Sequence, residues 1–222
     1  MESTVSHLKR CLPFWEKLTD AQQTLLTTRS GWVTYGRGET IHRGDEECVG
    51  LILVETGQLR VCMLSEDGRE ITLYRLYPGD VCVLSASCVL EAITFDVFVE
   101  AVEDTRMLNI PADSFRQVME ENIYAEAFSY KTATLRFSEV MWTMQQILFM
   151  GVDRRLAIFL LDEIARTGSD TLHLTHEQVA RYMGTAREVV SRMLKYFASE
   201  GLVALSRGGI QVTDRKRLRE MT

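Results

Sequence analysis

The chain has 222 residues, 46% of them hydrophobic and 25% charged, which are the proportions of an ordinary globular protein. No apolar run approaches the roughly 20 residues of a membrane-spanning helix and no signal peptide is visible, so we exclude a membrane protein and expect a cytoplasmic location. The net charge is −6, but residues 1–150 hold 13 Lys/Arg against 22 Asp/Glu, whereas residues 151–222 hold 12 against 9. This asymmetry suggests a sensor half followed by a half that binds a polyanion.

Short strands separated by turns are predicted between residues 30 and 110. The strand segments are rich in β-branched and aromatic residues, and apolar positions alternate with polar ones. Glycine-containing turns recur between them at intervals of roughly 10 residues, which is the spacing of a compact antiparallel sandwich or barrel. We expect strands at residues 31–35, 49–54, 59–64, 71–76, 97–101 and 106–110.

A long helix is predicted after these strands. Pro111 opens a short helix that ends near Glu121, and no glycine or proline occurs from Ile123 to Leu148, so the second helix would be about 39 Å long. Its apolar residues alternate at spacings of four and three, as in a coiled-coil seam. It is either a core helix of one domain or, as we prefer, a dimer helix, because no other long helix is available to cover it. The expected seam consists of Tyr130, Phe137, Met141, Met144 and Leu148.

Two helices joined by a tight turn are predicted further along the chain, after an amphipathic helix over residues 154–165. Residues 175–178, Thr-His-Glu-Gln, form a capping-box pattern that predicts a helix to Met183, and Gly184 ends it. Residues 185–188, Thr-Ala-Arg-Glu, repeat the pattern and predict a second helix to about Glu200. This spacing is typical of a DNA-binding helix-turn-helix.

The second of these helices has two different faces. Its apolar residues would pack on the first helix, whereas charged and hydroxyl side chains cover the opposite face. Such a face is usually only solvated, but this one lies in the first turns, where a recognition helix meets base edges. Arginine can bond guanine O6 and N7 together, and glutamate can accept from cytosine N4. We therefore predict base contacts by Arg187, Glu188, Ser191 and Arg192.

A β-hairpin is predicted after the second helix, with strand segments at residues 202–205 and 210–212 and a turn at residues 206–209 that tolerates positive φ. This hairpin would form a wing. We expect phosphate contacts from the wing, from the second helix and from the helix starts, which hold register and make binding depend on salt without reading sequence. The residues expected to make these contacts are Thr175, His176, Thr185, Lys195 and Arg207.

Together these features resemble the Crp/Fnr family of bacterial transcription regulators. The resemblance is strongest over residues 175–202, THEQVARYMGTAREVVSRMLKYFASEGL, and extends to residues 155–161 and to the glycine spacing of the strand region. It implies an α+β protein with a jelly-roll-like antiparallel β-roll of the cyclic-nucleotide-binding type over residues 1–121, a dimerisation helix over 122–150 and a winged helix-turn-helix over 151–222. It further implies a homodimer on a palindromic site in double-stranded DNA, with a half-site resembling TGTGA or TTGAT. RNA polymerase is expected as a further partner.

The effector region departs from the family members that bind cyclic AMP, which carry a glutamate for the ribose and an arginine for the phosphate. Leu84 stands about where that glutamate would be, and Phe95 about where that arginine would be. Val140 and Met141 fall near positions that carry hydroxyls for the adenine. A cyclic phosphate without a cationic partner would be a poorly compensated buried charge, so we predict no useful binding of cyclic nucleotides.

No cofactor and no metal are predicted. The five cysteines are widely spaced and lack a CxxC pair, and only Cys11 lies near the region where oxygen-sensing relatives hold an iron–sulfur cluster. We therefore expect buried thiols. None of the four histidines, His7, His42, His173 and His176, has a recognisable haem-ligand setting.

The predicted effector pocket would be apolar and lined by sulfur. Three interpretations stay open: a small hydrophobic effector, a thiol redox switch between Cys82 and Cys88, or a filled core without an effector. The expected lining is Cys82, Leu84, Cys88, Phe95, Val140 and Met141.

Two other classes of function fit the sequence less well. An enzyme is disfavoured because no P-loop, GxSxG, HExxH or comparable motif occurs. A winged helix that binds protein instead of DNA is the alternative, but the basic residues Arg187, Arg192, Lys195 and Arg207 argue against it.

Overall fold

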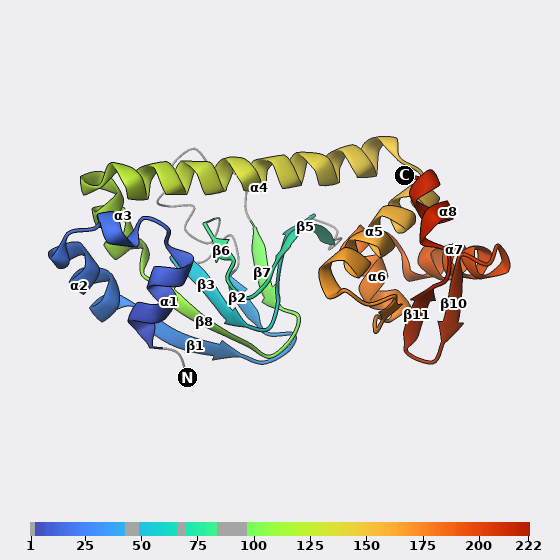
Figure 1. The fold of residues 1–222 in the computed structure, drawn as a ribbon, viewed down its shortest axis with the longest axis horizontal. Coiled ribbons are helices and arrows are strands. Elements are labelled where there is room, and N and C mark those ends of the chain that lie inside the picture. The colour runs from blue at the N-terminus through green and yellow to red at the C-terminus, as the bar shows by residue number, and fades with distance from the viewer. Residues whose placement is uncertain (1–2, 43–48, 66–69, 84–96) are drawn as a thin grey trace. The chain divides into compact units, whose positions relative to one another are not determined.

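The structure is a computed structural model that describes residues 3–42, 49–65, 70–83 and 97–222. The described chain divides into two compact units, the first ending at Val140 and the second beginning at Met141, with a few residues around Thr72 grouped with the second. The elements before this division are α1 (Thr4–Cys11), a 3₁₀ helix (Trp15–Lys17), α2 (Asp20–Arg29), β1 (Gly31–Tyr35), β2 (Thr40–His42), β3 (Leu51–Thr56), β4 (Leu59–Leu64), β5 (Glu70–Leu76), β6 (Val81–Cys82), β7 (Phe98–Ala101), β8 (Thr105–Ile110) and α3 (Ala112–Glu121). Helix α4 (Ile123–Phe149) contains the division, and α5 (Val152–Thr167), β9 (Thr171–Leu172), α6 (His176–Met183), α7 (Arg187–Ser199), β10 (Val203–Ser206), β11 (Gly209–Val212) and α8 (Arg215–Glu220) follow it (Figure 1).

The strands of the first unit form an antiparallel roll of two four-stranded sheets, in the orders β1-β8-β3-β6 and β2-β7-β4-β5. Strand β1 pairs with β8 from Gly31 opposite Asn109 to Tyr35 opposite Thr105. The six predicted strands are confirmed to within two residues at each end. Strands β2 and β6 were not predicted, because segments of three and two residues are too short to show a period.

The core of the roll is centred on β3, whose residues Leu51 to Val54 are all buried. Strand β3 has a hydrogen-bonded neighbour on each edge, β8 and β6. Helix α1 packs against it through His7, a buried residue whose Nε2 lies 3.3 Å from the carbonyl oxygen of Leu53. The turn after β3 requires Gly57, because φ there is +84° and a Cβ would lie 2.4 Å from Oγ1 of Thr105.

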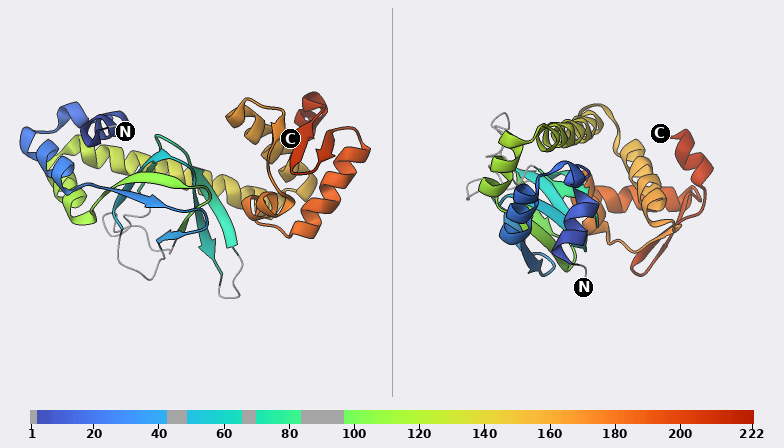
Figure 2. Two further views of the ribbon diagram at one scale, coloured as in Figure 1. Left: turned by 90° about the horizontal axis from the view of Figure 1, so that it is seen from below. Right: turned by 60° about the vertical axis from the view of Figure 1, so that its left-hand side comes forward.

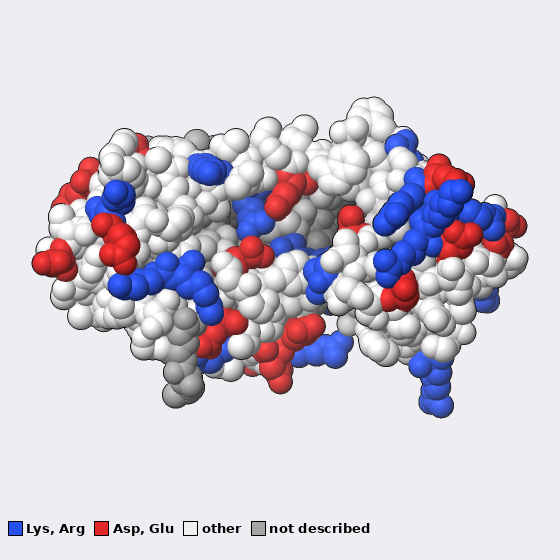
Figure 3. Space-filling model, viewed as in Figure 1, with Lys and Arg blue, Asp and Glu red and all other residues white. Residues whose placement is uncertain are grey.

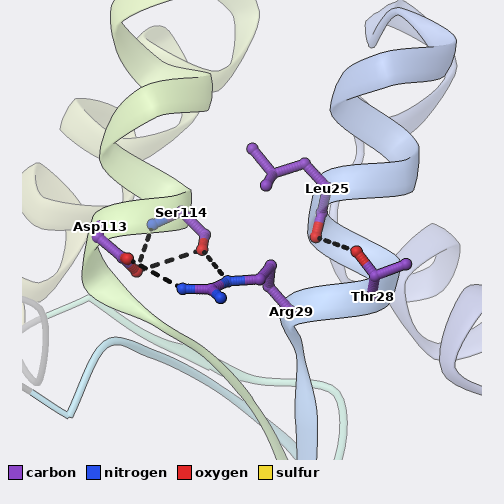
Figure 4. A network of polar contacts seen from close by, with 5 residues as sticks. All are labelled: Leu25, Thr28, Arg29, Asp113 and Ser114. Carbon is purple, nitrogen blue, oxygen red and sulfur yellow. Dashed lines mark hydrogen bonds and ion pairs between the residues drawn. The ribbon is translucent and has the colours of Figure 1, made fainter.

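A polar contact joins the end of α2 to the start of α3 (Figure 4). The guanidinium of Arg29 donates to Oδ2 of Asp113 at 3.2 Å and to Oγ of Ser114 at 3.5 Å. The backbone amide of Ser114 donates to Oδ1 of Asp113, and this bond is the main reason that the pKa of Asp113 lies below its ordinary value. The contact connects α2 to α3, which is followed by the long helix.

Helix α4 begins at a side-chain cap. Oδ1 of Asn122 accepts hydrogen bonds from the backbone amides of Tyr124 at 3.0 Å and Ala125 at 3.3 Å, which satisfies donors that have no partner within the helix. The helix then continues without a break to Phe149, so the predicted long helix is confirmed. Figures 1 and 2 show its first part running along the roll.

The two sides of α4 differ in burial. Ala125, Phe128, Ala133 and Val140 belong to or pack against the core of the roll. The predicted seam lies on another side, where Phe137 is 62% exposed and Leu148 is 63% exposed. All five predicted seam residues are exposed: Tyr130, Phe137, Met141, Met144 and Leu148. In the described chain they therefore form an apolar stripe open to solvent.

The second unit combines four helices after α4 with a three-stranded sheet of order β10-β11-β9. Its core is formed by buried residues of α5, α6 and α7, such as Leu160, Val179 and Leu194. The predicted helix over residues 154–165 is confirmed and is two residues longer at each end. The predicted fold class, an α+β protein with a β-roll, a long helix and a winged helix-turn-helix, is confirmed. None of the described helices is long and apolar enough to cross a membrane.

Candidate nucleic-acid interface

Helix α6 has the predicted capping box. Oγ1 of Thr175 accepts from the backbone amide of Gln178 at 3.1 Å, and Oε1 of Gln178 accepts from the backbone amide of Thr175 at 2.9 Å. Gly184 ends the helix in the left-handed region, with φ at +60°. The amide of Thr185 then donates to the carbonyl of Ala180. This bond closes a loop of six residues, as in a Schellman motif.

The start of α7 differs from the prediction. The expected second capping box at residues 185–188 is wrong, because the N-cap is Ala186 and no side chain caps the helix. Thr185 belongs to the turn that closes α6, so it lies one residue too early to cap α7. The amides at the start of α7 are therefore left for an outside acceptor, and they form the positive end of the helix dipole.

Helix α7 has the two faces that its sequence predicts. Val190, Leu194 and Phe197 are fully buried in the same core as α6. Of the four predicted base-reading residues, Arg187, Glu188 and Arg192 have exposed side chains, whereas Ser191 is half-buried. The structure thus leaves two cations and one carboxylate in solvent on the first two turns of one helix.

Ser191 is held by a residue of α6. Nδ1 of His176, the first residue of α6, lies 2.9 Å from Oγ of Ser191. The pKa of His176 lies below its ordinary value, mainly because of burial and further because Arg187 and Lys195 are nearby cations. His176 was predicted only as a phosphate contact, because a contact between residues fifteen positions apart has no signal in the local sequence.

The wing is the hairpin of β10 and β11, with Ser206 opposite Gly209. Arg207 is exposed in its turn, and Gly208 has φ at +84°, as the predicted turn requires. A groove runs between the start of α6, the start of α7 and the wing. Its lining is Leu174, Thr175, His176, Glu177, Arg187, Ser206, Gly208, Gly209 and Ile210. The structure therefore brings Arg187, a predicted base-reading residue, to one groove with the wing. Thr175 and His176, two of the predicted phosphate contacts, line the same groove.

Basic side chains gather over the elements that follow α4, with acidic ones among them (Figure 3). Among the predicted phosphate contacts, Lys195 and Arg207 are exposed, and Thr185 is half-buried. The helix α8, with sequence Arg-Lys-Arg-Leu-Arg-Glu, adds four cations that were not assigned a role. Arg215 and Arg217 of α8 form ion pairs with Asp170 and Glu200, so part of this charge is locally neutralised.

The predicted effector pocket is described only in part. Cys82 is fully buried and Val140 packs against the core of the roll, but Met141 is exposed on α4. Leu84, Cys88 and Phe95 lie outside the described residues. The structure therefore places Cys82 and Val140 in the roll core and leaves Met141 outside it.

Two residues that the prediction did not name lie in this region. The guanidinium of Arg136 is stacked over the ring of Tyr74 with 4.9 Å to its centroid, and it donates to both carboxylate oxygens of Glu139 at 2.8 and 3.0 Å. Burial, followed by the neighbouring Cys82, raises the pKa of Tyr74 well above its ordinary value. Beside Cys82 the described residues therefore include a phenol and a guanidinium, and the lining of the effector pocket stays a prediction. Arg136 and Tyr74 are far apart in sequence, so no local pattern predicts their contact.

Two family models match the chain. The Crp-like helix-turn-helix domain matches residues 154–221, and the cyclic nucleotide-binding domain matches residues 32–122. The two matched segments coincide with the winged unit and with the roll.

The chain is also similar to known regulators. A transcriptional regulator of the Crp/Fnr family from Eubacterium rectale, whose crystal structure is known, is 44% identical and has a TM-score of 0.87, with 94% of this chain and 97% of that chain covered. The cyclic AMP receptor protein of Thermus thermophilus is 26% identical over 190 residues, 84% of this chain and 86% of that protein. The nitrogen fixation regulation protein FixK of Azorhizobium caulinodans is 26% identical over 204 residues, 84% of this chain and 77% of that protein.

Proposed function

Since the chain belongs to the Crp/Fnr family of DNA-binding transcription regulators, we propose that it is a cytoplasmic homodimer that binds a palindromic promoter site through α7. The observation that carries this proposal is the exposed group Arg187, Glu188 and Arg192 at the uncapped start of α7. Within the proposal, residues 1–121 are the sensor, residues 122–150 the dimerisation helix and residues 151–222 the DNA-binding domain.

The chemistry of the exposed group fits the edges of base pairs in the major groove. Arg187 and Arg192 each carry a planar fork of donors that matches O6 and N7 of guanine, and the carboxylate of Glu188 can accept from N4 of cytosine. Since Glu188 and Arg192 are four residues apart, they lie on one face of the helix and can address neighbouring base pairs.

The residues around this group supply phosphate contacts in the proposal. Lys195 and Arg207 are exposed cations on α7 and on the wing. Thr175, His176 and Thr185 stand at the helix starts, where backbone amides and the helix dipole favour an anion. Such contacts hold the helix in register and make the affinity fall steeply with salt.

Dimerisation is proposed to occur through the exposed stripe on α4. Phe137, Met141 and Leu148 are large apolar side chains that remain in solvent in the single chain. Their spacing of four and seven residues is that of a coiled-coil seam, so a second copy of the same helix would bury them against identical residues. A two-fold axis along this seam would present two copies of α7 to the two half-sites.

The sensor is proposed to respond to an effector other than cyclic AMP or to none, and RNA polymerase is the proposed partner at the promoter. A thiol switch between Cys82 and Cys88 is one form of response. It predicts that oxidant and reductant change the affinity for DNA in the wild type. The double variant Cys82→Ala and Cys88→Ala should then lose that change, and the switch fails if the variant keeps it.

A selection experiment tests the proposed function. The purified full chain is incubated with a pool of random duplexes at low and at moderate salt, and bound duplexes are sequenced. The wild type should enrich a palindromic motif, whereas Arg187→Glu and Arg192→Glu should lose the enrichment. Lys216→Glu, a charge reversal at an exposed residue of α8, is the matched control and should keep it. A wild-type dimer that ignores duplex DNA at low salt would favour the protein-interaction module instead.

A further inference from the structure

A side-chain hydrogen bond links the start of α6 to the recognition face of α7. Nδ1 of His176 and Oγ of Ser191 are 2.9 Å apart. Ser191 lies one turn after Glu188 and directly before Arg192, so it stands between two of the residues proposed to read bases. Any contact of Ser191 with a base is therefore made by a hydroxyl that already has a protein partner.

This partner determines which way the hydroxyl of Ser191 can bond. A serine hydroxyl has one proton to donate and two lone pairs that accept. When Nδ1 of His176 carries no proton, it accepts the proton of Ser191, and Oγ offers only lone pairs to a base. When Nδ1 carries a proton, it donates to Oγ, and the proton of Ser191 is free for a base.

The two states suit different bases. A hydroxyl that only accepts is complementary to the amino groups of adenine and cytosine in the major groove. A hydroxyl that donates is complementary to N7 of a purine, to O6 of guanine or to O4 of thymine. The protonation of one histidine thus changes the base that the neighbouring serine can favour.

Resting on the proposed role of α7 as the recognition helix, we propose that His176 is a positioning residue that sets the base preference of Ser191. Neutral His176 with its proton on Nε2 holds Ser191 as an acceptor for an adenine or cytosine amino group. Protonated His176, in which both ring nitrogens donate, turns Ser191 into a donor. The protein therefore changes its preference at one base pair of each half-site as the pH falls.

The surroundings of His176 are consistent with the neutral form in the free protein. Burial comes first among the causes that lower its pKa, and Arg187 and Lys195 of α7 follow. Glu177 of α6 lines the same groove, and the wing contributes to the groove only residues without charge, Ser206, Gly208, Gly209 and Ile210. A DNA phosphate placed beside the ring would favour the charged form. The complex then binds more protons than the free protein, so the affinity rises as the pH falls from the pKa of His176 in the complex toward its pKa in the free protein, which lies below the ordinary value of about 6.5.

The test is a random-duplex selection with the full chain at about pH 8 and at about pH 6, on either side of the ordinary histidine pKa. Four variants are compared with the wild type: His176→Phe, which keeps a ring but no nitrogen, Ser191→Ala, the double variant, and His176→Asn. Asparagine places an amide near the position of Nδ1 and does not titrate. His173→Phe is the control, because His173 is an exposed histidine three residues before His176.

The wild type should change its preference at one base-pair position by about three- to ten-fold between the two pH values, the range expected for one hydrogen bond. His176→Phe and Ser191→Ala should each abolish this change, and the double variant should show no further effect. His176→Asn should keep a preference at this position without its pH dependence. His173→Phe should behave as the wild type.

Two results would overturn the inference while leaving the proposed function intact. One is that the variant His176→Phe keeps both the base preference of the wild type and the pH dependence of that preference. The other is an effect of His176→Phe that is equally large when Ser191 is already alanine, because the histidine would then not act through the serine. If the wild type selects no motif at either pH, the proposed function fails and the inference fails with it.

Discussion

The buried guanidinium of Arg155 in α5 donates a hydrogen bond to the carbonyl oxygen of Met183, the last residue of α6. Burial lowers the pKa of Arg155, because the charged form loses hydration. Carbonyls at the end of a helix lack a partner within the helix, and a cation there also favours the helix dipole. Arg155 thus joins α5 to the point where the chain turns from α6 into α7.

Replacing Arg155 should therefore loosen the helix-turn-helix. We expect Arg155→Met to lower the free energy of unfolding by about 1–3 kcal/mol, because the carbonyl of Met183 stays buried without its donor. Urea unfolding followed by circular dichroism measures the change. Arg219→Met, at an exposed arginine of α8, is the control and should change stability by less than about 0.5 kcal/mol. Equal effects of the two substitutions would contradict the role given to Arg155.

Arg187 and Lys195 lie on the same helix but should differ in what they contribute to DNA binding. Arg187→Ala should weaken binding to the selected site by about 10- to 100-fold and relax the preference at one base pair, because a bidentate contact to a base is lost. Lys195→Ala should weaken binding to all duplexes alike and reduce the slope of affinity against salt by about 1.

Fluorescence anisotropy with the selected duplex and a scrambled duplex, over a series of salt concentrations, separates the two effects. A loss of preference on changing Lys195, or a uniform loss on changing Arg187, would reverse the assigned roles.

The parts of this interface that sequence predicts are those governed by neighbouring residues. The capping box of Thr175 and Gln178 and the left-handed Gly184 each act within one helical turn, so their pattern predicts the ends of α6 correctly. The start of α7 depends on competition between two adjacent turns. Thr185 has the side chain of an N-cap, but its amide closes α6, and the helix begins at Arg187 instead.

Contacts between distant residues were beyond the reach of sequence patterns. His176 and Ser191 were each predicted to face DNA, but their bond to each other depends on how α6 packs on α7. Arg136 lies on a helix whose apolar residues dominated the prediction, and its stacking on Tyr74 of β5 requires the folded roll. Helix α8 was missed because six residues are too few to show a helical period.

The stripe on α4 should decide whether the protein is a dimer. Phe137→Asp places a charge on the seam, where a second copy would have to bury two carboxylates against each other, so the variant should be monomeric. Lys131→Glu also changes an exposed residue of α4, but off the predicted seam, and should leave the dimer intact. Sedimentation equilibrium of the two variants and the wild type gives the oligomeric state. A dimer that persists in Phe137→Asp would exclude this seam as the contact.

Cyclic nucleotides should not bind usefully to the roll. Arg136 is the described cation beside Tyr74 and Cys82, but its guanidinium donates to both oxygens of Glu139 and lies 3.8 Å from Asp80, so its charge is already compensated. A cyclic phosphate at this place would have to compete with these carboxylates for the one guanidinium, and would remain a poorly paired charge.

Calorimetry with cyclic AMP and cyclic GMP should give no binding heat at micromolar protein and ligand. Glu139→Gln removes the negative charge beside Arg136 and keeps the shape of the side chain. This variant therefore tests why cyclic nucleotides do not bind. If compensation of Arg136 is what prevents binding, the variant should bind a cyclic nucleotide more tightly than the wild type does. Micromolar affinity in the wild type would contradict the prediction, because it would require a phosphate partner that neither Arg136 nor the residues at positions 84 and 95 can supply.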